Sequence, residues 1–192
     1  MKQLLVLIFI LLGIVQAKAE IVELASYQDG FGRDRIIKMV LKEDKPSAVI
    51  IPCEKDDGSE GFLFQPISYL FAVESYFEKI RDKYIEWTQT AFSNGVEEYE
   101  KKFAASGYLF GFYWFNPEMR LGSSELNAIW RLSQDRNIVE ATAKVIDDNG
   151  SHEIAIFHLS FSSPKDIDMI LEAISKANIK SHTPQTIDSL FQ

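Results

Sequence analysis

The sequence predicts an α+β fold in which helices pack on one side of an antiparallel β-sheet. Apolar residues alternate with period two in both halves of the chain, which is typical of strands. Between these halves, residues 67–92 carry an apolar stripe at steps of three and four, which is typical of a helix. We therefore expect N-terminal strands plus a C-terminal four-strand meander, with a long amphipathic helix and a C-terminal helix on one side of the sheet.

Residues 1–19 have the pattern of a secretory signal peptide. Lys2 gives a positive start, residues 4–15 are apolar, and the small residues Ala17 and Ala19 stand where a signal peptidase reads the chain. The apolar run is shorter than the about 20 residues that span a bilayer. An uncleaved anchor is the alternative. We expect a secreted or periplasmic protein in which residues 20–192 form a single α+β domain with no membrane span after cleavage.

The composition is acidic and almost free of cysteine. The formal net charge is −8, and loss of Lys2 and Lys18 with the signal peptide, which contains no acidic residue, makes it −10. An acidic surface repels phosphate backbones, so we expect no nucleic acid as a partner. Cys53 is the only cysteine and follows an apolar run, which predicts a buried thiol without functional chemistry.

Three strands are expected before the long helix. Residues 21–27 and 35–42 flank a turn rich in glycine and aspartate, and residues 48–53 form a short apolar segment. The acidic residues 54–61 then predict an exposed loop. The helix follows over 67–92, after a proline and before Asn-Gly, and its spacing continues as a bent extension or second short helix to about Phe103.

Four antiparallel strands are expected in the C-terminal half. They are residues 107–115, 124–134, 137–146 and 152–161, and Asn-Gly between the last two is typical of a type I′ hairpin turn. A C-terminal helix begins after Ser163, which can cap it, with proline at its first position and Asp166 completing a capping box.

The first of these strands, "GYLFGFYWF", is the densest aromatic run in the chain. Alternation places Phe112 and Trp114 on one face, but the opposite face is also apolar. This favours a central strand covered on both sides, because large aromatic residues dominate cores. A stacking platform for a ligand is the alternative interpretation.

Two acidic groups and one histidine are candidates for chemistry. One acidic row on the long helix consists of residues 74, 78, 82 and 86. Lysine and arginine residues lie at ion-pair spacing from it, which is typical of a solvated helix face. The second group, in residues 54–60, fails the calcium-loop template because Gly58 falls fifth rather than sixth. His158 lies among apolar residues and is either a satisfied core histidine or part of a pocket. We expect no metal and no cofactor.

The usual catalytic templates are absent from the sequence. It contains no G-x-S-x-G, H-E-x-x-H, phosphate-binding glycine loop or dinucleotide fingerprint, so no catalytic residue is assigned. The sequence favours an exported soluble protein that binds a protein or another envelope component without catalysis. One alternative is a small carrier of an apolar ligand held between the long helix and the sheet. Another is a hydrolase that uses His158 and a carboxylate. The candidate ligand-binding residues are Tyr84, Trp87, Phe112, Trp114 and His158.

Overall fold

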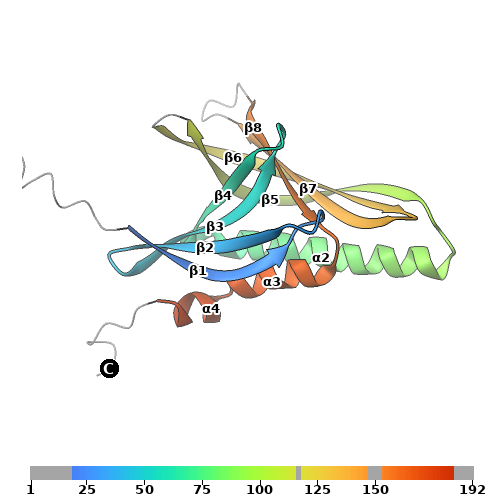
Figure 1. The fold of residues 1–192 in the computed structure, drawn as a ribbon, viewed down its shortest axis with the longest axis horizontal. Helices are drawn as coiled ribbons and strands as arrows, with labels where there is room; N and C mark the ends of the chain where they lie inside the picture. Colours follow the sequence, from blue (N-terminus) through green and yellow to red (C-terminus); the bar gives the residue numbers. More distant parts are fainter. Residues whose placement is uncertain (1–18, 116–117, 147–152, 184–192) are drawn as a thin grey trace, which may run out of the picture.

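The computed structural model describes residues 19–115, 118–146 and 153–183, and it has the predicted α+β class (Figure 1). The segment 1–18 of the predicted signal peptide and the Asn149-Gly150 turn lie outside the described residues. In chain order the elements are β1 (Ala19–Gln28), β2 (Asp34–Lys42), β3 (Lys45–Lys55), β4 (Glu60–Pro66), η1 (Ile67–Tyr69), α2 (Leu70–Ser93), β5 (Tyr99–Phe115), β6 (Glu118–Ser133), β7 (Arg136–Ile146), β8 (Glu153–Phe161), α3 (Pro164–Ile174) and α4 (Lys176–Ser181).

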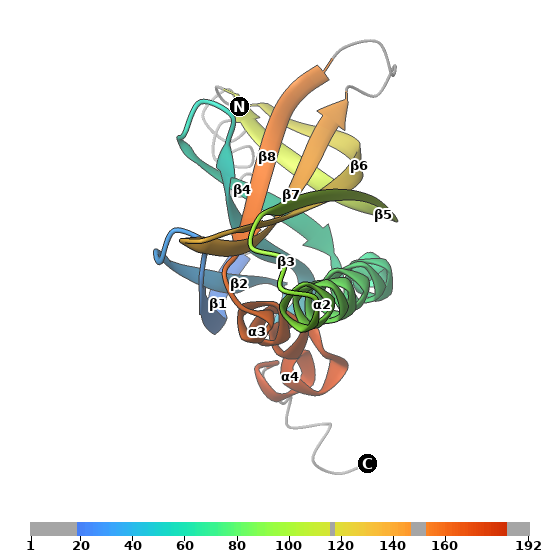
Figure 2. The ribbon, with the colours of Figure 1, turned by 90° about the vertical axis from the view of Figure 1, so that its right-hand side faces the viewer.

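All eight strands belong to one antiparallel sheet in which sequence neighbours are spatial neighbours. The sheet also closes on itself, because β8 pairs with the end of β3 through Glu54–His158 and Lys55–Phe157. Strands β3 to β8 therefore form a closed ring, and β2 and β1 extend from β3 (Figure 2). The β3–β8 seam is short, so side chains that bridge it contribute to closure.

The expected acidic loop at 54–61 is confirmed only at residues 56–59, which form an exposed turn, and its other residues belong to strands. β3 continues to Lys55 and β4 begins at Glu60, with a tight turn that uses the positive φ of Gly58. β4 has a weak sequence signal, because its three inward positions carry glycine, leucine and glutamine. A strand with so few apolar inward residues does not show the alternation that identified the others.

The long helix is confirmed, but its expected extension is not. Residues 67–92 correspond to η1 and α2, and Gly95 then adopts a positive φ that a continuing helix does not allow. Tyr99 opens β5, so Tyr99 and Phe103 lie on a strand. Their separation of four residues fits one face of a strand as well as a turn of helix, which explains the error.

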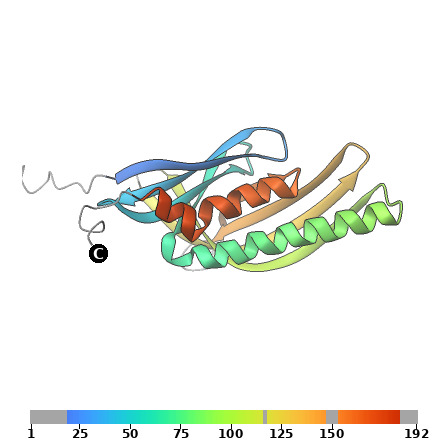
Figure 3. The same cartoon turned by 90° about the horizontal axis from the view of Figure 1, so that it is seen from below.

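The helices α2 and α3 lie side by side on one face of the sheet (Figure 3). Phe77 of α2 meets Phe161 of β8 edge to face, with ring centroids 6.1 Å apart. Ser163 caps α3 as predicted, since its hydroxyl accepts a hydrogen bond from the Lys165 amide at 3.1 Å. Within the described ranges, no helix has the length and apolar character that crossing a bilayer requires.

Candidate functional site

An apolar groove of about 280 Å³ lies where the C-terminal end of α2 meets β5 and β6. Figure 3 shows this end of the helix beside the start of β5. The residues that line the groove share an almost entirely apolar surface and are Trp87, Thr90, Ala91, Asn94, Val96, Tyr99, Lys101 and Trp130. We call this feature the aromatic groove.

Aromatic rings that contact one another form the walls of the groove. Trp87 packs edge to face on Phe103 with centroids 5.1 Å apart, and its centroid lies 6.0 Å from that of Trp130. The Trp130 indole donates to Asn137 Oδ1 at 2.9 Å, and Asn137 Nδ2 donates to Thr88 on α2 at 3.2 Å. These bonds fix the ring of Trp130, so this wall of the groove is preorganised.

The groove leaves aromatic surface open to solvent. Tyr99 is 53% exposed although its ring lies 6.2 Å from that of Trp130. Two ammonium groups approach the Trp87 ring, Lys101 at 4.4 Å and Lys83 at 5.9 Å from the centroid. Lys83 is also ion-paired with Glu86 at 2.5 Å. The groove thus combines flat apolar walls with cations at its border.

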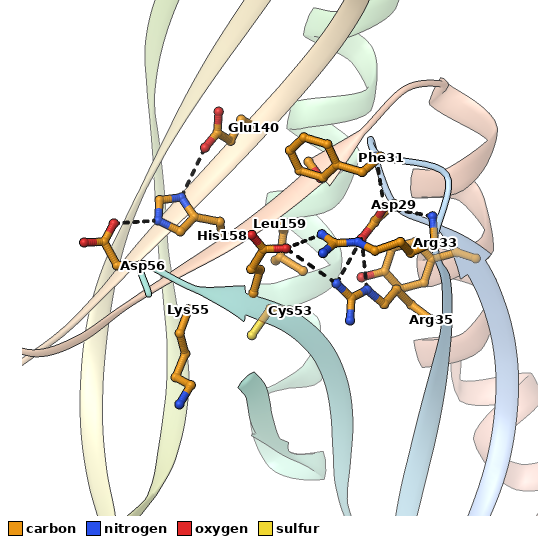
Figure 4. Close-up of a pocket in the computed structure, with 13 residues that line it drawn as sticks. Asp29, Phe31, Arg33, Arg35, Cys53, Lys55, Asp56, Glu140, His158 and Leu159 are labelled. Atoms are coloured by element: carbon orange, nitrogen blue, oxygen red, sulfur yellow. Dashed lines mark hydrogen bonds and ion pairs between the residues drawn. The ribbon is translucent and has the colours of Figure 1, made fainter. Parts of the chain in front are cut away.

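A second cavity, of about 180 Å³, is lined mainly by charged side chains and lies near the β3–β8 seam (Figure 4). Asp29 is its most buried acid. Its carboxylate accepts hydrogen bonds from the backbone amides of Phe31 and Arg33 and from the guanidinium groups of Arg33 and Arg35. Burial opposes ionisation, but these donors outweigh it and lower the pKa of Asp29. We call this cavity the charged cleft.

His158 lies between two carboxylates at the border of the charged cleft, as Figure 4 shows. Its Nδ1 is 3.1 Å from Glu140, and its Nε2 is 3.2 Å from Asp56. The hydrogen bond with Glu140 is the main cause that raises the pKa of His158, and the same bond lowers the pKa of Glu140. Glu140 also pairs with Arg131, which contacts Glu100 at 3.1 Å.

These contacts form a charged row that crosses β5, β6, β7 and β8 and reaches the β3–β4 turn. Because Arg131 directly follows Trp130 on β6, the charged row and the aromatic groove lie on opposite faces of the sheet. The row joins the two strands of the short seam, since Asp56 follows β3 and His158 belongs to β8. We interpret it as a support for closure of the ring.

The charged cleft is poorly suited to the hydrolysis considered from the sequence. A histidine that acts as a general base must be neutral before it takes a proton, but the two neighbouring carboxylates raise the pKa of His158 and so favour its protonated form. Cys53 also borders this cleft, yet it is buried, and burial raises the pKa of its thiol. Both pKa shifts therefore favour the protonated form of the side chain, which is inactive as a base or nucleophile.

The row makes stability depend on pH through His158. The pKa of His158 is higher in the folded chain than in the unfolded chain, so its stabilisation is complete below about pH 6.5 and is lost as pH rises through the folded pKa. We expect His158→Ala to lower the free energy of unfolding by about 1 kcal/mol at pH 6 and by less at pH 9. Urea denaturation at the two pH values measures this. A difference that is constant or increases with pH contradicts the prediction.

The sequence-predicted site residues do not share one site. Trp87 lines the aromatic groove and His158 borders the charged cleft. Tyr84 is buried, and its hydroxyl donates to the Asn137 carbonyl at 2.5 Å, so it holds α2 on β7. Phe112 and Trp114 belong to β5, but their side chains lie outside the described residues, so the question of core or platform stays open.

Two groove residues were missed, Tyr99 and Lys101, because both fell in the expected helical extension. The expected core position of Trp130 is confirmed, since Trp130 is 2% exposed, but its part in lining the groove was not predicted. The pairing of Lys101 with Trp130 across β5 and β6 brings them together, and only the true start of β5 gives that register. Gly95 is the sequence signal for the end of the helix, and a helix that ends there leaves Tyr99 and Lys101 for the strand.

The acidic residues of the two sequence clusters are distributed among several ion pairs and hydrogen bonds. On α2, Asp82 meets Arg81 at 3.0 Å and Glu86 meets Lys83, as expected of a solvated face. Near the seam, Glu54 contacts Arg33 and Asp57 contacts Ser59. Among the described residues, no group of three or more His, Cys, Asp or Glu side chains is arranged to hold a metal ion.

Comparison with known proteins gives no relative from which a role could be transferred. No protein-family model, no curated protein and no solved structure matches this chain. The geometry of the aromatic groove and the charged cleft, together with the sequence, therefore carries the functional proposal.

Proposed function

We propose that this protein is an exported, non-enzymatic binding protein that holds a small apolar ligand in the aromatic groove. The observation that carries the proposal is a groove of about 280 Å³ whose walls are the rings of Trp87, Tyr99 and Trp130. Pockets for drug-sized ligands span about 300–1,000 Å³ and are mostly apolar with few polar groups. At about 280 Å³ the groove lies just below that range, so it suits a ligand smaller than a typical drug.

The position of the groove supports a carrier more specifically than a generic interaction surface. It lies between the long helix and the sheet, the interface expected to hold an apolar ligand, although Trp87 is the one residue of that expectation that the groove lining includes. The hydrogen bonds from Trp130 to Asn137 and from Asn137 to α2 hold one wall before any ligand arrives. Preorganised walls reduce the entropy lost on binding.

Export is part of the proposal, and it is supported by the signal-peptide pattern of residues 1–19. The site of action is then the periplasm or the exterior. The acidic charge of the chain supports ligands other than nucleic acid.

Calorimetric titration with 1-octanol, a neutral apolar probe, tests the proposal. We expect saturable one-site binding to wild type and affinity at least tenfold weaker for Trp87→Ala, because truncation of a hot-spot residue, often a tryptophan, costs about 2 kcal/mol or more of binding free energy. Phe62→Ala is the matched control. Phe62 is an exposed aromatic residue of β4 that does not line the groove, and its replacement should leave affinity unchanged.

Circular dichroism must show that Trp87→Ala keeps the wild-type fold, since Trp87 also packs on Phe103. Trp87→Phe preserves an aromatic wall and should recover part of the affinity. Saturable binding that Trp87→Ala leaves unchanged contradicts a site in this groove, and the absence of binding contradicts the carrier function.

A further inference from the structure

We infer that the ligand of the aromatic groove is a small apolar molecule with one carboxylate, and that Lys101 binds this carboxylate. The inference rests on the proposed function and adds the chemical class of the ligand. It starts from the position of the Lys101 ammonium, which lines the groove and lies 4.4 Å from the centroid of the Trp87 ring.

Lys101 differs from the other cations nearby in its partners. Lys83 pairs with Glu86, and Arg131 pairs with both Glu100 and Glu140. Lys101, by contrast, makes no ion pair with any side chain that the structure describes, and its interaction is with the Trp87 ring. An ammonium has three N–H donors, so the contact with a ring leaves donors for an anion.

The other end of the groove is less suited to an anion than the end at Lys101. Thr90 and Ala91 lie in the last turn of α2, where the helix dipole is negative. The carbonyls of both residues accept hydrogen bonds from the Asn94 amide, and that of Ala91 also accepts one from Val96. A ligand therefore lies with its apolar part towards the helix end and its charged end towards Lys101.

A cationic ligand fits this arrangement less well than an anionic one. Its positive group would compete with Lys101 for the face of Trp87 and would be repelled by the ammonium already there. A ligand with two carboxylates would place its second charge against apolar walls or near the negative end of α2. An apolar molecule with one carboxylate therefore matches both the positive charge of Lys101 and the apolar walls of the groove.

The test compares octanoate, 1-octanol and octylammonium, which share an alkyl chain and differ in charge, by calorimetry at pH 7 and low salt. We expect octanoate to bind wild type about fivefold more tightly than 1-octanol, the upper range for a partly exposed ion pair. Octylammonium should bind most weakly. The preference for octanoate should decrease at high salt, because exposed charges are screened.

Lys101→Met retains the length of the side chain and removes its charge, so it should make octanoate and 1-octanol equal in affinity. Lys102→Met is the matched control. Lys102 is the next residue of β5, is exposed, and faces away from Lys101, so its replacement should keep the fivefold preference.

The outcomes separate this inference from the proposed function. Equal affinity of wild type for octanoate and 1-octanol, tighter binding of octylammonium, or a preference that survives in Lys101→Met each overturns the role of Lys101. In those cases the binding of 1-octanol, weakened by Trp87→Ala, still supports the groove as an apolar site. Absence of binding by all three probes overturns the proposed function itself.

Discussion

Replacing Phe161 with alanine is expected to lower the free energy of unfolding by about 3–5 kcal/mol. Phe161 ends β8, is fully buried, and packs against Phe77 of α2. Its ring also lies 6.1 Å from that of Tyr27 in β1. One side chain thus joins the long helix, the edge of the sheet and the strand that closes the ring. Truncation leaves a cavity that three separate elements border, and a cavity bounded by rigid elements collapses only partly.

Chemical denaturation measures the effect, with Phe62→Ala as the matched control. Phe62 is a phenylalanine of β4 that is 44% exposed, and we expect its truncation to change stability by about 0.5 kcal/mol or less. Because a typical domain has only about 5–15 kcal/mol of stability, Phe161→Ala should shift the midpoint strongly. A wild-type midpoint for Phe161→Ala means that Phe161 is not part of the core contact that joins these elements.

The elements that the sequence identified correctly are those whose hydrophobic period is clean. The stripe of α2 places Val73, Phe77 and Ile80 in the core, and alternation in β8 places Phe157 and Phe161 there. Both follow from the geometry of a helix or strand with one buried face. The order of the strands in the sheet can also be predicted from the sequence, because consecutive antiparallel strands joined by short turns become neighbours.

Closure of the ring was beyond the sequence. The β3–β8 pairing joins Lys55 to Phe157, residues far apart in the chain, and it uses two register pairs at an acidic segment. No local pattern encodes such a contact. The partners of His158 could not be predicted for the same reason, because Asp56 reaches it across the seam and Glu140 reaches it from the neighbouring strand.

The candidate site was predictable in region but not in composition. Trp87 marks the helix–sheet interface, and a tryptophan near the end of an amphipathic helix suggests a contact there. The strand side of the groove required the register between β5 and β6, which places Lys101 opposite Trp130. The expected strand began only at residue 107, so Tyr99 and Lys101 were assigned to a helix and the wall that they form was not predicted.

Replacing Asp29 with alanine is expected to destabilise the fold by about 3 kcal/mol near neutral pH, the lower part of the range for breaking a buried ion pair. Asp29 is 4% exposed, and Arg35, whose side chain is 11% exposed, contacts it at 3.0 Å. The nearest other carboxylates, Glu54 at 3.8 Å and Glu60 at 3.9 Å, compensate only partly. The substitution also leaves the amides of Phe31 and Arg33 without their side-chain acceptor.

The pH dependence of Asp29→Ala distinguishes a lost carboxylate from lost packing. The pKa of Asp29 is lower in the folded chain, so its contribution is present above the unfolded pKa of about 3.9 and is lost as pH falls through the folded pKa. The difference between wild type and Asp29→Ala should therefore be largest at pH 7 and should decrease on acidification. Asp34→Ala, which removes an exposed carboxylate that contacts Gln28, should remain within about 0.5 kcal/mol of wild type. A difference for Asp29→Ala that is unchanged between pH 7 and pH 3 contradicts the electrostatic explanation, because packing lost with the side chain does not titrate.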